Sequence, residues 1–98
     1  MNAINYPLID NMKAKQYELH IDGLIPSIEY IKAQNQIYLT HTELPVEFGG
    51  KGIGSAMVGQ VLEDIEQKEL SLVPACPFVA AYIKQQPEGK ISINRNKY

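Results

Sequence analysis

The chain has 98 residues and a formal net charge of -2, with 45% hydrophobic and 20% charged residues. This length supports one modest core, so we expect residues 1–98 to form a single domain with its core at about 15–88. A weakly acidic chain with scattered basic residues is not expected to bind nucleic acid. We expect no membrane association, because no apolar run approaches membrane-spanning length and the N-terminus does not resemble a signal peptide. The single cysteine excludes an internal disulfide and favours a reducing, cytoplasmic location.

Three strands are predicted in the first half of the chain, at residues 15–21, 25–33 and 36–43. Apolar and polar side chains alternate along the first of them, and Asp22-Gly23 is a strong signal for the turn that follows. The connections between these strands are too short for parallel crossovers. The sequence therefore predicts an antiparallel meander.

Pro26 lies near the start of the second predicted strand. A proline has no backbone N–H to donate, which indicates an edge strand or an irregular start. A monomer is the default expectation for this chain. If the protein dimerises, the edge strand near residues 25–33 is the expected place for pairing.

The second half of the chain has a different pattern. Apolar residues at helical spacing predict a helix over residues 52–68, and the short apolar run at 70–73 predicts a buried strand parallel to the third one. A second helix is predicted at 78–86 and is stopped by Pro87-Glu88-Gly89, and a short strand is an option at 91–93. The fold class is α+β, an antiparallel meander joined by a helical crossover to a parallel strand, then a C-terminal helix.

A glycine-rich turn connects the third strand to the first helix. It runs through Gly49, Gly50, Lys51, Gly52, Ile53, Gly54 and Ser55. Unpaired backbone N–H groups at the positive end of a helix dipole bind phosphate or pyrophosphate, and glycines allow the close approach and the positive φ angles that such a turn needs. The alternative is a glycine-rich loop without a ligand, which is less common for so dense a cluster. The pattern is not a Walker P-loop.

Two further blocks flank this turn and complete a family resemblance. His41-Thr42-Glu43-Leu44-Pro45 precedes the turn, and Pro74-Ala75-Cys76-Pro77-Phe78 leads into Tyr82-Ile83 and Pro87-Glu88. With the glycine turn between them, these blocks resemble the GNAT superfamily of acetyl-CoA-dependent N-acetyltransferases. The closest match is to its small single-domain members with a Pro-x-Cys-x-Phe block. Gly49 stands where the superfamily usually has arginine or glutamine.

The resemblance implies a minimal GNAT-like fold that uses acetyl-CoA as cosubstrate. The backbone of the glycine turn would bind the CoA pyrophosphate, and the Lys51 ammonium would add positive charge. The pantetheine arm would lie between the two parallel strands and pair with the backbone of residues 40–44, which include Thr42 and Leu44.

Cys76 and His41 are the first pair of candidate catalytic residues that the resemblance suggests. Cys76 lies at a strand-to-helix junction, where the helix dipole favours a thiolate that could accept the acetyl group. His41 could act as its base. The alternatives are a buried structural cysteine and a hydrogen-bonded core histidine, because His41 shares the alternation of Ile37 and Leu39.

Glu43 and Tyr82 form a second pair of candidates. Many GNAT enzymes use a strand carboxylate to deprotonate the amine, and a tyrosine near the position of Tyr82 to protonate the departing CoA thiolate. The alternatives are a solvated strand-end glutamate and a tyrosine that only packs.

Three functions are therefore open at this point. The first is an N-acetyltransferase that moves acetyl from acetyl-CoA to an amine, directly or through Cys76, with a small amine, a protein N-terminus or a lysine side chain as acceptor. The second is a non-catalytic module that binds or senses CoA or acyl-CoA, which the missing closing β-hairpin of the superfamily favours. The third is a domain that binds another nucleotide or anion. Two separated histidines and one cysteine show no metal-ligand spacing.

Overall fold

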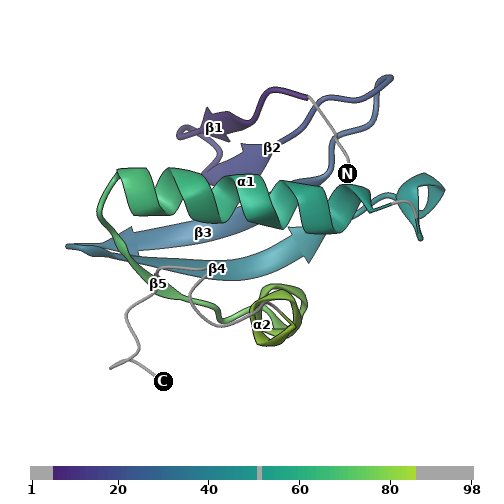
Figure 1. The fold of residues 1–98 in the computed structure, drawn as a ribbon. Coiled ribbons are helices and arrows are strands. Elements are labelled where there is room, and N and C mark those ends of the chain that lie inside the picture. Colours follow the sequence, from purple (N-terminus) through teal and green to yellow (C-terminus); the bar gives the residue numbers. More distant parts are fainter. Residues whose placement is uncertain (1–5, 51, 86–98) are drawn as a thin grey trace.

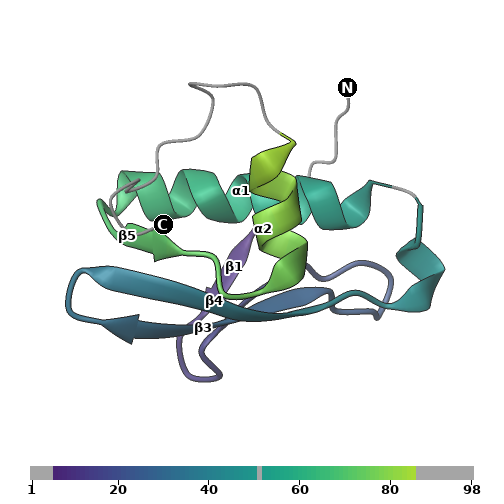
Figure 2. The same cartoon turned by 90° about the horizontal axis from the view of Figure 1, so that it is seen from below.

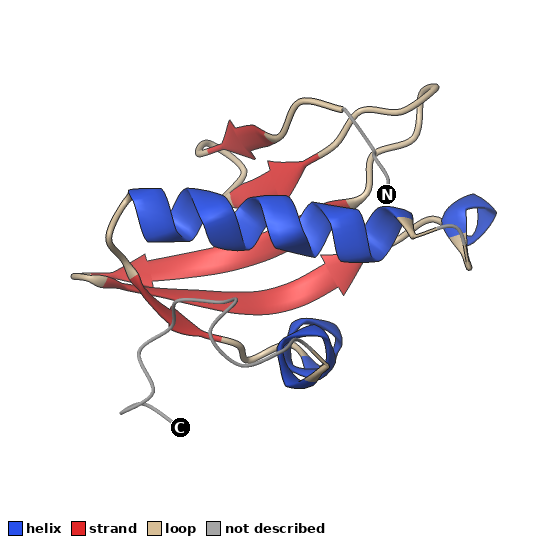
Figure 3. Ribbon diagram, in the orientation of Figure 1, coloured by secondary structure: helices blue, strands red, loops and turns tan. Residues whose placement is uncertain are grey.

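The computed structural model describes residues 6–50 and 52–85. The strands are Ile9–Asn11 (β1), Gln16–Glu18 (β2), Ser27–Ala33 (β3), Gln36–Glu43 (β4) and Ser71–Val73 (β5), and the helices are Ile53–Gln67 (α1) and Pro77–Lys84 (α2), with a 3₁₀ turn at Val46–Phe48 (η1). The five strands form one sheet in sequence order (Figures 1 and 3). Strands β1 to β4 are antiparallel, whereas β5 is parallel to β4. The predicted α+β class and the parallel crossover are confirmed.

Helix α1 covers one face of the sheet, and α2 stands beside the β4–β5 side of that sheet (Figures 1 and 2). Helix α2 contacts both α1 and β4. The core lies between these layers, and its members with no exposed surface are Tyr17, Leu19, Ile28, Ile37, Leu39, Met57, Val58, Val61 and Val79. Within residues 6–50 and 52–85, no helix combines the length and the apolar character that a membrane span needs.

Most predicted elements lie where the sequence places them. Strand β4 has the predicted bounds, and α1 is flanked by Gly52 and Lys68 as its caps. The Asp22-Gly23 turn is also confirmed: both residues have positive φ (52° and 82°), as a two-residue type I′ hairpin requires. Strand β2 is shorter than predicted, and the predicted stop at residues 87–89 and the optional strand at 91–93 lie outside the described part of the chain.

Of the two alternatives that Pro26 suggested, the edge strand near residues 25–33 is wrong, because β3 begins only at Ser27 and lies inside the sheet. Strand β3 pairs with β2 on one side and with β4 on the other, so the dimer contact expected there has no open edge along Ser27–Glu29. Pro26 precedes the strand and contributes its carbonyl, which accepts the N–H of Leu19 at 3.0 Å. Its missing N–H therefore does not constrain the position of β3.

Strand β1 was not predicted. Its three residues, Ile9–Asn11, are too few to show an alternating pattern, and side chains hold them in place. Lys68 at the end of α1 forms ion pairs with Asp10 and Asp64 at 2.9 and 2.8 Å. Tyr30 donates a hydrogen bond to Asp10 at 2.6 Å, and Tyr17 donates one to Asp64 at 2.7 Å. This network connects β1, β2 and β3 to α1.

Strand β4 contains a β-bulge at Thr40. Glu29 pairs with His41 and Tyr30 pairs with Leu39, so Thr40 is the extra residue, and its hydroxyl donates to the Glu29 carbonyl at 3.3 Å. A bulge inserts one residue and so exchanges the two faces of the strand beyond it. Before the bulge, odd-numbered residues of β4 are buried; after it, His41 is exposed and Thr42 is half-buried.

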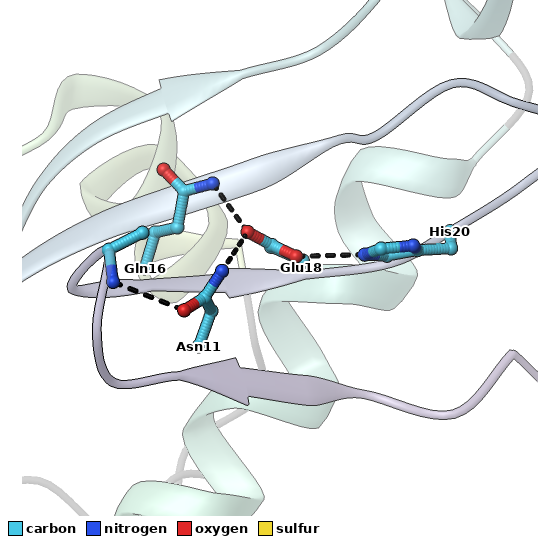
Figure 4. A network of polar contacts seen from close by, with 5 residues as sticks. Asn11, Gln16, Glu18 and His20 are labelled. Carbon is cyan, nitrogen blue, oxygen red and sulfur yellow. Dashed lines mark hydrogen bonds and ion pairs between the residues drawn. The ribbon is translucent and has the colours of Figure 1, made fainter.

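Glu18 is a buried carboxylate with three hydrogen-bond donors around it (Figure 4). Asn11, Gln16 and His20 donate to it at 2.9, 2.7 and 2.8 Å. The hydrogen bonds from His20 and Gln16, with a smaller one from Asn11, outweigh burial and lower the pKa of Glu18 from its usual 4.5. Glu18 therefore joins β1 to β2 as a charged acceptor.

We expect Glu18→Gln to lower the free energy of unfolding by about 1–2 kcal/mol at pH 7, because an amide group replaces one acceptor oxygen in a cluster of donors. A lowered pKa stabilises the fold above pH 4.5 and this contribution is lost as the pH falls below that value. Urea denaturation of both proteins at pH 7 and pH 3 measures the difference. A gap that stays constant between these two pH values would contradict the role of the charge.

Candidate functional site

The glycine turn has the backbone conformation that only glycine adopts readily. Gly50 and Gly52 have φ angles of 73° and 78°, and a Cβ added at either position would meet no atom within 4 Å. Conformation, and not crowding, therefore requires glycine at these two positions. Gly49 has an ordinary φ of -60°. Lys51 lies outside the described residues.

The N-terminus of α1 is open at this turn. Gly52 is the N-cap and provides no side-chain cap, and the first turn of α1 contains no acidic residue. The first N–H groups of a helix have no partner within that helix, and they stand at its positive end. In α1 these belong to Ile53, Gly54 and Ser55. Since Ile53 is buried, only its backbone can take part in binding.

An open cleft of about 180 Å³ lies against this helix end. It is lined by Leu44, Phe48, Gly50, Gly52, Gly54, Ser55 and Phe78. Its volume is below the roughly 300–1,000 Å³ of pockets that enclose a whole ligand. The cleft therefore fits one part of an extended ligand, with backbone amides on one side and apolar side chains on the other.

Gly54 serves packing between the two helices. A Cβ at this position would lie 2.7 Å from Cζ of Phe78 and 3.3 Å from Cδ2 of Leu44. The lack of a side chain at Gly54 therefore makes room for the Phe78 ring of α2. At Gly54, a ligand in the cleft could therefore contact only the backbone, through its N–H group.

The two parallel strands separate beside this cleft. Pairing of β4 with β5 covers Gln36–Tyr38 and Ser71–Val73. In the described part of the chain, residues 40–43 of β4 have no strand partner on the β5 side. The backbone amide of Thr42 acts on the Cys76 sulfur, and the end of the β5 pairing at Tyr38 leaves room beside the rest of this segment for an extended ligand.

Cys76 is at the point where β5 leads into α2. It is the N-cap of α2, its exposed fraction is 5%, and its sulfur lies 3.1 Å from the hydroxyl oxygen of Thr42. Burial raises the pKa of the thiol. The Thr42 hydroxyl, followed by the backbone amides of Val79, Phe78 and Thr42, outweighs burial, so the net pKa is below its usual 9.0. The amides of α2 act on the sulfur without forming a side-chain cap hydrogen bond.

His41 and Glu43 form a pair of their own on the exposed part of β4. Nε2 of His41 lies 2.8 Å from Oε1 of Glu43, and their side chains are 57% and 69% exposed. The interpretation of His41 as a core histidine on the face of Ile37 and Leu39 is wrong, because the bulge at Thr40 reverses the alternation. The structure brings Cys76 together with Thr42 and leaves His41 with Glu43.

Tyr82 lies between α2 and the middle of α1. It is half-buried and packs on the hydrophobic core. A Cβ added at Gly59 would be 3.1 Å from the Tyr82 hydroxyl, so this glycine makes room for the tyrosine. The packing interpretation accounts for its position. Among residues 6–50 and 52–85, no group of three His, Cys, Asp or Glu side chains could hold a metal ion.

A sequence profile described as GCN5-related N-acetyl-transferase matches residues 16–91. The chain belongs to this family. The matched segment of this family member runs from β2 through α2 and includes the glycine turn, Thr42 and Cys76. The chain is also similar to "Protein NATD1" of Xenopus tropicalis, with 24% identity over 79 residues, covering 76% of this chain and 72% of that protein. The predicted superfamily is thus confirmed; the assignment to a branch with a Pro-x-Cys-x-Phe block remains a prediction.

Two contacts in this family member were missed at the sequence level. Thr42 was expected to contribute only its backbone, and Phe78 was considered only as part of a motif. Both contacts depend on the position of α2 beside β4. The periodicity of a single sequence does not predict how two such elements pack together. The Gly54–Phe78 pair had a weak signal, since a glycine inside a helix often marks close packing.

Proposed function

We propose that this protein binds acetyl-CoA and transfers its acetyl group to an amine. The observation that carries the proposal is the uncapped N-terminus of α1, preceded by two glycines with positive φ and opening into the cleft. This arrangement suits a diphosphate, because backbone N–H groups and the helix dipole stabilise negative charge there. Membership of an acetyltransferase family supports acetyl-CoA as the source of that diphosphate.

The pantetheine arm would lie along β4, next to Thr42 and Leu44. Its amides would pair with the strand backbone where β5 no longer does so. Leu44 and Phe78 would contact the ligand from the apolar side of the cleft. This course leads from the helix end toward Cys76, so the thioester would arrive near the sulfur.

Transfer would follow one of two routes. In the first, the Cys76 thiolate attacks the thioester carbonyl, a new S–C bond forms, and CoA leaves as a thiolate. An amine then attacks the acetyl-cysteine, which releases the amide, the Cys76 thiolate and one proton. In the second route, the amine attacks acetyl-CoA directly, and Glu43 or His41 removes its proton on the exposed side of β4. Tyr82 would protonate the CoA thiolate only if its hydroxyl left its place beside Gly59.

Calorimetric titration with CoA, followed by turnover assays, tests the proposal. Free CoA thiol would be measured with acetyl-CoA and three acceptors: a small polyamine, a peptide with a free N-terminus, and an N-terminally blocked peptide with one lysine. Binding with turnover of one acceptor is the expected result. Binding without turnover of any of them would favour a CoA-binding module, and a failure of CoA to bind would overturn the cofactor assignment.

A further inference from the structure

The hydroxyl of Thr42 is the side-chain group in contact with the Cys76 sulfur. The oxygen and the sulfur are 3.1 Å apart, and the sulfur is almost completely buried. Thr42 can face Cys76 because the bulge at Thr40 turns Thr42 toward the covered side of β4. Without that extra residue, the alternation of the strand would place Thr42 on the open face and His41 against α2.

The chemistry of this contact favours the ionised sulfur. In the neutral state either atom can be the donor, whereas a thiolate can only accept. When the proton leaves Cys76, the threonine hydroxyl can rotate and donate to the sulfur at no cost in backbone movement. The backbone amides of Phe78 and Val79, in the first turn of α2, also lower the pKa of this sulfur. A buried thiolate would therefore have the Thr42 hydroxyl as its side-chain donor.

Within the described part of the chain, the main influences on the pKa of this sulfur include no charged side chain. The groups that shift its pKa are burial, the Thr42 hydroxyl and three backbone amides. On β4, His41 and Glu43 lie on the opposite face and pair with each other. On α2, the hydroxyl of Tyr82 lies at Gly59. The residues of β5 and α1 that share the core cluster with Cys76 are apolar, as Leu72, Met57 and Val58 illustrate.

We propose that Thr42 is the positioning residue of the nucleophile: its hydroxyl, and not His41, holds Cys76 as a thiolate directed at the incoming thioester. The part of this inference that concerns the incoming thioester rests on the proposed function. The part that concerns ionisation of the sulfur rests on the Thr42–Cys76 geometry alone. It assigns Thr42 a side-chain role in addition to any backbone contact with the pantetheine arm.

The test compares Thr42→Val, which loses the hydroxyl and keeps the branched shape, with Thr42→Ser, which keeps the hydroxyl. The rate of alkylation by iodoacetamide is measured against pH for the full-length chain, and thiolate absorbance in the ultraviolet gives a second titration that does not depend on access. Cys76 is the single cysteine, so Cys76→Ala supplies the blank for both measurements. Thermal unfolding confirms that each variant is folded.

We expect Thr42→Val to raise the midpoint of the titration by about one pH unit, which slows alkylation below the midpoint about tenfold. Thr42→Ser should keep the wild-type midpoint, and His41→Ala should leave it unchanged. An unchanged midpoint in Thr42→Val, or equal shifts in both Thr42 variants, would overturn the inference. Titration of the wild-type protein with CoA keeps the two proposals apart, because absent CoA binding defeats the proposed function and leaves the midpoint comparison intact.

Discussion

Gly52→Asp is expected to weaken CoA binding at least about 100-fold, whereas Gly52→Asn is expected to weaken it only a few-fold. The two side chains have the same size, and asparagine and aspartate are the non-glycine residues that best tolerate a positive φ such as the 78° of Gly52. The backbone cost is therefore similar in both variants. Their difference isolates the effect of one negative charge at the end of α1.

The size of that effect follows from electrostatics. Two unit charges 4 Å apart at a protein surface interact by about 4 kcal/mol, and each 1.4 kcal/mol changes an affinity about tenfold. An aspartate here would also occupy the helix end that the pyrophosphate is proposed to use. The same carboxylate stabilises a helix N-terminus, so the loss of binding should come without a loss of fold relative to Gly52→Asn.

Calorimetric titration of both variants with CoA measures the effect, and urea denaturation reports their stability. Dephospho-CoA, which keeps the pyrophosphate and lacks the ribose phosphate, serves as a second ligand and should respond in the same way. Equal affinities for the Asp and Asn variants would mean that the α1 N-terminus does not hold the pyrophosphate.

Wild-type protein incubated with acetyl-CoA is expected to gain one acetyl group that hydroxylamine removes, and Cys76→Ala is expected to gain none. The reason is that the Thr42 hydroxyl lies 3.1 Å from this sulfur and that the pKa of the sulfur is lowered despite its burial, which favours the nucleophilic thiolate. The change is all-or-none, because the chain has no second cysteine to replace it.

Intact-protein mass spectrometry measures this adduct. Wild-type protein unfolded in urea gives the rate of unassisted acetylation, which the folded protein must exceed. Chasing the adduct with an acceptor amine shows whether the acetyl group moves on. If the folded protein remains unmodified while turnover proceeds at the wild-type rate in Cys76→Ala, transfer is direct and Cys76 is a structural residue.

Much of the fold could be predicted because local patterns determine it. The apolar spacing of α1, the Asp22-Gly23 turn and the alternation along Gln36–Leu39 each depend on residues close in sequence. Strand β1 depends instead on the distant Lys68 and Tyr30, which hold Asp10. The internal place of β3 depends on its pairing with both β2 and β4, whereas Pro26 in the sequence indicates an edge strand.

In the candidate site, too, features that depend on local sequence could be predicted and features that depend on distant contacts could not. The glycine turn could be predicted because positions with a positive φ favour glycine, as at Gly50 and Gly52. The partner of Cys76 could not, since a single bulged residue, Thr40, decides whether Thr42 or His41 faces the covered side. A bulge in the middle of an alternating strand has no reliable signature, so a position beyond it is assigned to the wrong face.

Phe78 belongs both to the cleft at the α1 N-terminus and to the first turn of α2, which follows Cys76. Its ring lies against Gly54 in the cleft, and its own backbone amide is one of the groups that lower the pKa of Cys76. A ligand that fills the cleft would contact this ring, and the ring is attached to the turn that follows the sulfur. Ligand binding in the cleft and the reactivity of Cys76 are thus linked through Phe78. An inhibitor that displaces Phe78 would be expected to change both.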